Sequence, residues 1–258
     1  MPEDHVRQPS ESASERGEIL VGCAGWALRT EHAAAFPGEG SHLERYAGRL
    51  RAVEINSSFY RSHRPATYAR WAASVPPDFR FAVKVPRAIS HQLRLERTAE
   101  VLDRFLSEVA ALGDKRGPLL LQLPPSLAFH PRVAADFFAA LRERDAGPVV
   151  CEPRHPTWFT PEATQLLLRS QVARAAVDPA VVPAAAEPAG WPGLVYYRLH
   201  GAPRIYYSTY SDADLRERAA ALLRCAAAAP VWCIFDNTAL GAATENALDL
   251  QQRLAAGR

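Results

Sequence analysis

Eight short apolar runs, rich in β-branched and aromatic residues, recur along the chain, and helix-like segments follow most of them. Strands that alternate with helical stretches are typical of a parallel sheet. A length of 258 residues is also usual for a (β/α)8 barrel. We therefore predict one α/β domain over residues 18–258, folded as a TIM-like (β/α)8 barrel. The predicted strands are Ile19–Cys23, Arg51–Ile55, Phe79–Lys84, Pro118–Leu123, Pro148–Glu152, Val172–Asp178, Leu194–His200 and Val231–Asp236.

The segments between these runs carry helix signals. Thr98 is predicted to cap a helix that ends before Gly113, and Thr160 precedes a proline at the first position of another. Ser211 is predicted to open a third helix. Between the sixth and seventh strands, four prolines interrupt the chain. Because proline breaks a helix interior, we expect a loop or a single turn there, and hence an irregular barrel.

The composition narrows the partners rather than the fold. Thirty basic and 28 acidic residues give a net charge of +2, without the basic excess of an electrostatic nucleic-acid binder. Nucleic acid is therefore not the expected partner, although a local basic patch stays open. No run approaches the ~18 apolar residues that cross a membrane, and no signal-peptide core precedes the first strand. We expect a soluble, cytoplasmic protein without a membrane partner and with residues 1–17 as a disordered tail; the oligomeric state is not indicated.

Polar side chains recur at one position of these strands. Side chains two apart in a strand share a face, so Glu54 lies on the face of Ala52, and Lys84 on the face of Ala82. The corresponding positions at the ends of later strands carry Gln122, Glu152, Arg154, Arg198, His200 and Asp236. In a barrel these strand ends converge on the C-terminal mouth, which carries catalysis in TIM barrels. We predict that these side chains gather there.

Each position also has a structural interpretation, which the sequence leaves open. A glutamate at a strand end, such as Glu54, is often a solvated terminus or the partner of a nearby arginine. Glu152 and Arg154 can form a structural ion pair. His91 can cap a backbone group, and Trp158 either packs in the core or lines the mouth. The shared placement of the polar residues, more than any one of them, favours a functional site.

Several motifs occur in a fixed order along the chain. They are Gly22-Cys-Ala-Gly-Trp26, Val53-Glu-Ile-Asn-Ser-Ser-Phe-Tyr60, Phe81-Ala-Val-Lys84, Ser90-His91, Gly117-Pro-Leu-Leu-Leu-Gln-Leu-Pro-Pro125, Glu152-Pro-Arg-His-Pro-Thr-Trp158, Tyr197-Arg-Leu-His-Gly201 and Phe235-Asp-Asn237. Through them the chain resembles the DUF72 family of YecE-like proteins, from about Leu20 to Leu254. The resemblance implies a TIM-like barrel and a DUF72-like domain over residues 18–258. It implies no reaction, because the family is uncharacterised.

Acid–base chemistry suits the predicted mouth. Carboxylates, histidines and a lysine can exchange protons, while arginines can hold an anion. The predicted catalytic residues are Lys84, Glu54, Glu152 and His200. The predicted substrate-binding residues are Asn56, Tyr60, His91, Gln122, Arg154, His155, Trp158, Asp178, Arg198, Tyr207, Asp236 and Asn237. We expect Lys84 to pair with Glu54 on the neighbouring strand, and a buried Lys84 would suit a Schiff base if its pKa falls.

Three function classes follow from this site. The first is an enzyme of unassigned reaction class that acts on a small polar or anionic substrate without a required cofactor. The second is a metal-dependent phosphodiester or nucleic-acid hydrolase, since carboxylates and histidines can bind Zn2+, Mn2+ or Mg2+. A divalent metal therefore stays open, although no HExxH spacing supports it and neighbouring cations oppose a dication. The third is a non-catalytic ligand-binding or regulatory barrel.

Overall fold

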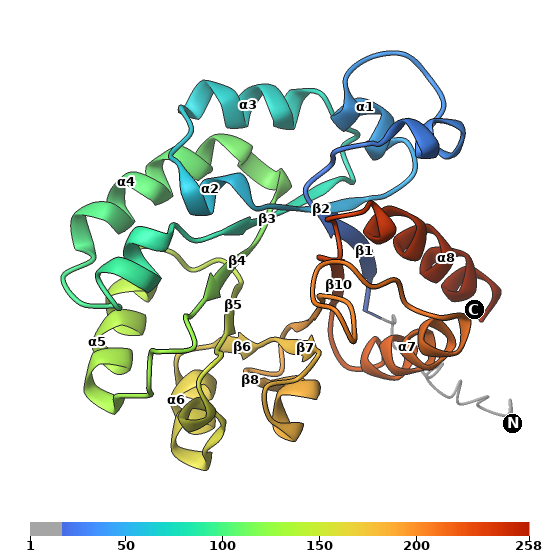
Figure 1. The fold of residues 1–258 in the computed structure, drawn as a ribbon. Helices are drawn as coiled ribbons and strands as arrows, with labels where there is room; N and C mark the ends of the chain where they lie inside the picture. The colour runs from blue at the N-terminus through green and yellow to red at the C-terminus, as the bar shows by residue number, and fades with distance from the viewer. Residues whose placement is uncertain (1–16, 258) are drawn as a thin grey trace, which may run out of the picture.

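A ring of helices surrounds a central set of parallel strands in the computed structural model, which describes residues 17–257 (Figure 1). The predicted tail lies outside the described residues except for Gly17. The strands are β1 (Ile19–Ala24), β2 (Ala52–Ile55), β3 (Arg80–Lys84), β4 (Arg116–Gln122), β5 (Val149–Glu152), β6 (Val172–Arg174), β7 (Ala176–Asp178), β8 (Ala189–Gly190), β9 (Val195–Leu199) and β10 (Val231–Phe235). The α-helices are α1 (His42–Ala47), α2 (Ser57–Tyr60), α3 (Pro65–Ala73), α4 (Ala99–Val109), α5 (Pro131–Arg142), α6 (Pro161–Arg169), α7 (Asp212–Cys225) and α8 (Ala242–Ala256).

The strands form a nearly closed barrel. Their order is β7-β9-β10-β1-β2-β3-β4-β5-β6-β8, and every pair except β6–β8 is parallel. The predicted sixth strand is divided at Ala175: β6 pairs with β5, and β7 pairs with β9 on the other side. One stretch of chain thus bridges both edges of the sheet and nearly closes it. The predicted TIM-like barrel is confirmed.

The link from β7 to β9 is irregular, as the prolines predict. It contains one 3-10 turn, Pro183–Ala186, and the two-residue strand β8, which runs antiparallel to β6. β8 therefore covers the edge of β6 that β9 leaves free. This link is the departure from strict strand–helix alternation that the sequence indicates.

Helix starts follow the predicted caps. The Thr160 hydroxyl accepts from the Ala163 amide at 3.3 Å before α6, and Ser211 forms a capping box with Asp214 before α7. Thr98 precedes α4, but its side chain makes no capping bond.

Among the helices of residues 17–257, none combines the length and the apolar character of a membrane-spanning segment.

The barrel interior is filled by the residues two positions before the predicted polar ends. This inner cluster includes Ala52, Ala82, Leu120, Val150, Tyr196 and Ile234. Each is buried, and the rings of Tyr196 and Trp232 stack with centroids 6.0 Å apart. Because side chains alternate along a strand, the next inward residue of each strand faces the mouth. The predicted alternation of inward and outward side chains is confirmed for these strands.

Candidate active site at the barrel mouth

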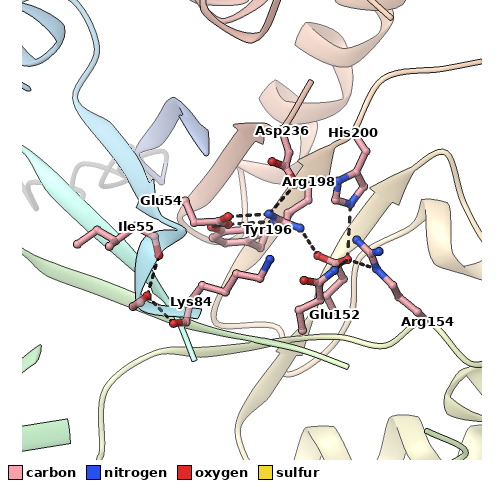
Figure 2. Close-up of polar contacts among 11 residues, drawn as sticks. Glu54, Ile55, Lys84, Glu152, Arg154, Tyr196, Arg198, His200 and Asp236 are labelled. Carbon is pink, nitrogen blue, oxygen red and sulfur yellow. Dashed lines mark hydrogen bonds and ion pairs between the residues drawn. The ribbon is translucent and has the colours of Figure 1, made fainter. Parts of the chain in front are cut away.

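Arg198, near the end of β9, is the centre of the mouth. Its guanidinium is fully buried and contacts carboxylates carried by three other strands or their ends (Figure 2). Nε and Nη2 donate to the two oxygens of Glu54 at 3.0 and 2.6 Å. Nη1 donates to Glu152 at 2.6 Å, and Nη2 also donates to Asp236 at 3.0 Å. One arginine thereby holds three carboxylates in place.

Polar side chains from other strands complete this network. The Tyr196 hydroxyl donates to Glu54 at 2.9 Å. Arg154 Nε and Gln122 Nε2 donate to Glu152 at 2.9 and 3.3 Å, so the predicted Glu152–Arg154 pair is confirmed. The mouth network, as the term is used below, consists of Glu54, Gln122, Glu152, Arg154, Tyr196, Arg198, His200 and Asp236.

Two carboxylates of the network, Glu152 and Asp236, are fixed charges. Burial by itself would raise the pKa of Glu152, but Arg198 and Arg154 outweigh it and hold that pKa well below its usual range. Burial likewise opposes the ionisation of Asp236, yet the Arg198 guanidinium and His200 lower its pKa. Both groups therefore stay ionised near neutral pH and do not carry protons there.

Lys84, the last residue of β3, points toward the network without pairing with it (Figure 2). It is 6% exposed, and no carboxylate oxygen of residues 17–257 lies within 4.0 Å of its ammonium. Nζ lies instead 4.4 Å from the centre of the Phe59 ring, a cation–π contact. The predicted pair of Lys84 with Glu54 is wrong. Glu54 is level with Ala82 rather than with Lys84, and Arg198 binds both of its oxygens.

The proton affinity of Lys84 is reduced. Burial, followed by the charge of Arg198, lowers its pKa from 10.5 to about 8, although Glu54, Glu152 and Asp236 act in the opposite direction. A lysine with this pKa is partly neutral near physiological pH. It can therefore act as an acid, a base or a nucleophile.

His200 is the second proton-exchanging group of the mouth. It is 4% exposed, and Nδ1 lies 3.1 Å from Asp236 Oδ2. Nε2 is buried 3.5 Å from Glu152 Oε1 and has no hydrogen-bond partner among the described residues. Burial lowers the pKa of His200, but Asp236 and Glu152 outweigh it and raise the pKa above its ordinary value. β9 and β3 lie four places apart in the strand order, so His200 and Lys84 approach the network from opposite sides of the barrel.

A cavity of about 600 Å3 opens beside the network, where β1, β2 and β10 end. Asn56, a predicted binding residue, lines it, and its Oδ1 is buried without a partner in residues 17–257. Ala24 also lines the cavity and is level with Glu54 on β2. The cavity therefore lies on the β1 side of Glu54, and the residues that line it do not belong to the mouth network.

The rim near Lys84 is cationic. His91, another predicted residue, packs edge-on against Phe59 with ring centroids 5.0 Å apart. Burial and then the charges of Lys84, Arg87 and Arg154 lower the pKa of His91. These basic groups act on one another across the rim, which makes the rim suitable for an anion.

Two predicted residues lie outside the mouth. Trp158 is 1% exposed and packs against Phe129 in the layer between strands and helices, where its Nε1 donates to the Leu127 carbonyl at 2.9 Å. Asp178 was predicted inside, but Val177 faces the interior, so alternation directs Asp178 outward, into a groove along α7. Their predicted positions at the mouth are wrong.

Four further predicted residues are peripheral. Tyr60 is 72% exposed, and Tyr207 is 40% exposed with its ring 3.9 Å from the Arg204 guanidinium. His155 is half-buried, and its ring accepts from the Thr157 amide at 3.3 Å as the cap of a 3-10 turn. Asn237 is fully buried, and its Nδ2 donates to Ser208 and Asn246, each at 2.9 Å. Asn237 thus joins two segments that support the mouth.

Three neighbours of predicted residues contact the site. Phe59, rather than Tyr60, lies under Lys84. The Ser58 hydroxyl lies 2.6 Å from the Lys84 carbonyl and 2.9 Å from that of Ile55, so it joins β2 to β3. Tyr206, rather than Tyr207, packs edge-on against His200 at 5.8 Å. The Val53–Tyr60 motif contains Ser58 and Phe59, and Tyr206 lies outside the motifs. The sequence carries no signal that separates adjacent residues in short turns.

A match to a family model identifies the relatives of this barrel. The model described as "Protein of unknown function DUF72" matches residues 20–258. The chain belongs to the DUF72 family. Among curated DUF72-like relatives, UPF0759 protein YecE of Escherichia coli K12 is 37% identical over 90 residues, which are 35% of this chain and 32% of YecE. UPF0759 protein YunF of Bacillus subtilis 168 is 24% identical over 152 residues, 55% of this chain and 53% of YunF. The chain thus spans about a third to a half of these relatives.

Solved DUF72 structures share the whole fold. A DUF72 family protein from Enterococcus faecalis V583 superposes with a TM-score of 0.78 at 25% identity, covering 92% of this chain and 95% of the other. One from Thermotoga maritima MSB8 gives 0.77 at 22% identity, covering 92% and 99%. The barrel is therefore the family fold.

The donor set of this DUF72 barrel does not resemble a metal centre. Within residues 17–257, no group of three or more His, Cys, Asp or Glu side chains is arranged to hold a metal ion. The three carboxylates that converge at the mouth share the Arg198 guanidinium. A dication between them would lie against a buried permanent cation, which Coulomb repulsion disfavours.

Glu152→Gln is expected to lower the free energy of unfolding by about 3 kcal/mol, because a buried cation loses a partner. The matched control is Asp145→Asn, which breaks the Arg116–Asp145 pair at the other end of the barrel, where both side chains are partly exposed. We expect a smaller loss there. Urea denaturation measures both. Ligand binding that survives in folded Glu152→Gln would make Glu152 purely structural.

Proposed function

We propose that this DUF72 protein is an enzyme that transfers protons on a small anionic substrate at the C-terminal mouth of the barrel. The observation that carries this proposal is a pair of buried proton-exchanging atoms: Lys84 Nζ, which has no carboxylate within 4.0 Å, and His200 Nε2, which makes no hydrogen bond in residues 17–257 and lies 3.5 Å from Glu152 Oε1. A buried polar group without a hydrogen bond destabilises a protein, so such groups are typical of functional sites.

The charge of the mouth favours an anion over a cation. Glu54, Glu152 and Asp236 carry three negative charges, and Arg198, Arg154 and Lys84 carry three positive ones. The sum is zero with a neutral His200 and positive once His200 is protonated. Because the carboxylates are already bound by arginines, the exposed charge is that of the cationic rim.

The residues take different roles in this proposal. Lys84 and His200 exchange protons with substrate from opposite sides. Glu54 and Glu152 hold Arg198, while Arg154 attracts the anionic group and His91 can donate a hydrogen bond to it. Asn56 and the cavity beside it receive the rest of the molecule.

Capture of metabolites from a cell extract, read by mass spectrometry, tests the proposal. We expect the wild type to retain an anionic metabolite and convert it on incubation, and Lys84→Met to stay folded without retaining it. Lys115→Arg is the matched control, because Lys115 donates only to the Ala72 and Val75 carbonyls, each at 2.6 Å. Retention by folded Lys84→Met contradicts the proposal. Retention without conversion indicates a ligand-binding barrel instead.

A further inference from the structure

Lysine is rare in this chain. Of its 30 basic Lys and Arg residues only two, Lys84 and Lys115, are lysines. The Lys115 ammonium donates to two backbone carbonyls, each at 2.6 Å, so it has hydrogen-bond partners. Lys84 has no such partner. Elsewhere the chain uses arginine for its cations, and lysine differs from arginine in that it can lose its proton and act as a nucleophile.

The environment of Lys84 shields it from bulk water and leaves its ammonium without a close carboxylate partner. Its side chain is 6% exposed, and Nζ lies over the Phe59 ring at 4.4 Å. The charged groups that face it are two cations, Arg198 and His91 when protonated, and three carboxylates, Glu54, Glu152 and Asp236. All three carboxylates are bound to Arg198, so none of them forms a close pair with the lysine.

We propose that Lys84 forms a Schiff base with the carbonyl carbon of a small oxo acid. This inference rests on the proposed function and names its substrate class. The neutral amine attacks the carbonyl carbon and forms a C–N bond. The nitrogen gives up two protons, the carbonyl oxygen takes up two, and that oxygen leaves as water. The step needs no oxidant or reductant.

The mouth supplies the groups that this step requires. His200 Nε2, which makes no hydrogen bond in residues 17–257 and lies 3.5 Å from Glu152 Oε1, is available to deliver a proton to the departing oxygen. The protonated imine carries one positive charge, as the ammonium does, so the carboxylates of the network stabilise both. The Arg154 side chain is 24% exposed and donates to Glu152 through Nε. Its other N–H groups are available to a ligand. Together with His91 it can bind the acid group of the substrate.

Reductive trapping tests the inference. The protein is incubated separately with three oxo acids, glyoxylate, pyruvate and 2-oxobutyrate, in the presence of sodium cyanoborohydride, and peptide mapping locates each adduct. We expect an adduct at Lys84 in the wild type and in Lys115→Arg, and none at that position in Lys84→Arg or Lys84→Met. The neutral fraction at pH 7 of an amine with a pKa of about 8 is roughly 300-fold that of an amine at 10.5, so labelling of Lys84 should be rapid. Its rate should rise from pH 6 and level off above pH 8.

The control lysine decides specificity. Equal labelling of Lys84 and Lys115 in one sample overturns the inference, as does the absence of an adduct at Lys84 with all three compounds. The proposed function is judged separately by metabolite capture. A captured metabolite that is lost from Lys84→Met, combined with no adduct at Lys84, leaves the proposed function standing and removes only the Schiff base.

Discussion

Arg198→Met is expected to destabilise the barrel by on the order of 5 kcal/mol, the largest effect of any single substitution at the mouth. The change leaves Glu54, Glu152 and Asp236 buried together without the cation that they share. Methionine fills the volume but supplies no donor. Chemical denaturation at neutral pH measures the loss, and Arg198→Lys, which keeps one charge, should fall between the two proteins.

The loss of stability in the Arg198→Met variant should also depend on pH. The pKa values of Glu152 and Asp236 are lowered in the folded protein, so their pairing stabilises it above the unfolded value of about 4. That contribution disappears as the pH falls through the folded values. The difference between wild type and variant should therefore shrink in acid. A folded Arg198→Met protein of unchanged stability at pH 7 would show that the mouth tolerates three uncompensated carboxylates.

Lys84→Met is expected to stabilise the protein at pH 7, by up to about 3 kcal/mol, while removing its function. The fall of the pKa of Lys84 from 10.5 to about 8 corresponds to this free energy, because a tenfold change in an equilibrium is worth about 1.4 kcal/mol. This free energy measures how strongly burial disfavours the ammonium in the folded state. Methionine has no charge to bury and keeps a favourable contact with the Phe59 ring.

The pH dependence of this gain follows from the direction of the shift. The folded pKa lies below the unfolded one, so the charged lysine destabilises the fold fully below about pH 8. The penalty decreases between pH 8, where the lysine of the folded state loses its proton, and pH 10.5, where the lysine of the unfolded state loses its proton as well. Denaturation at pH 7 and pH 10 should show a gain that shrinks with rising pH. Lys84→Arg is the control, since it keeps the charge and should show no gain. A less stable Lys84→Met protein at pH 7 would contradict the expectation.

Alternation along the strands was enough to predict the face of most site residues. Ala52 lies in the barrel interior and Glu54 above it, and the same relation holds for Val150 and Glu152. The reason is local, because the pleat of a strand sends successive side chains to opposite faces whatever lies next to it. Helix starts at Thr160 and Ser211 followed from local capping chemistry in the same way.

The register between neighbouring strands decided which charged side chains lie close together. Glu54 and Lys84 share a face, but β2 and β3 align Glu54 with Ala82, and Arg198 reaches Glu54 from across the barrel. A register between strands depends on the closure of the whole sheet, which no single segment encodes. The division of the sixth strand at Ala175 is another consequence of that closure.

The side-chain positions in the loops at the mouth could not be predicted from the sequence either. Tyr206, with a positive φ of 71°, and not Tyr207, turns toward His200. The Trp158 ring is drawn into the layer beneath α6 by apolar packing. The sequence by itself determined the barrel, the faces of its strands and the kinds of polar group at its mouth, because these follow from short-range periodicity. Only the tertiary structure decided which groups are paired and that the Lys84 ammonium has no carboxylate within 4.0 Å in residues 17–257, because pairing depends on distances between segments far apart in the chain.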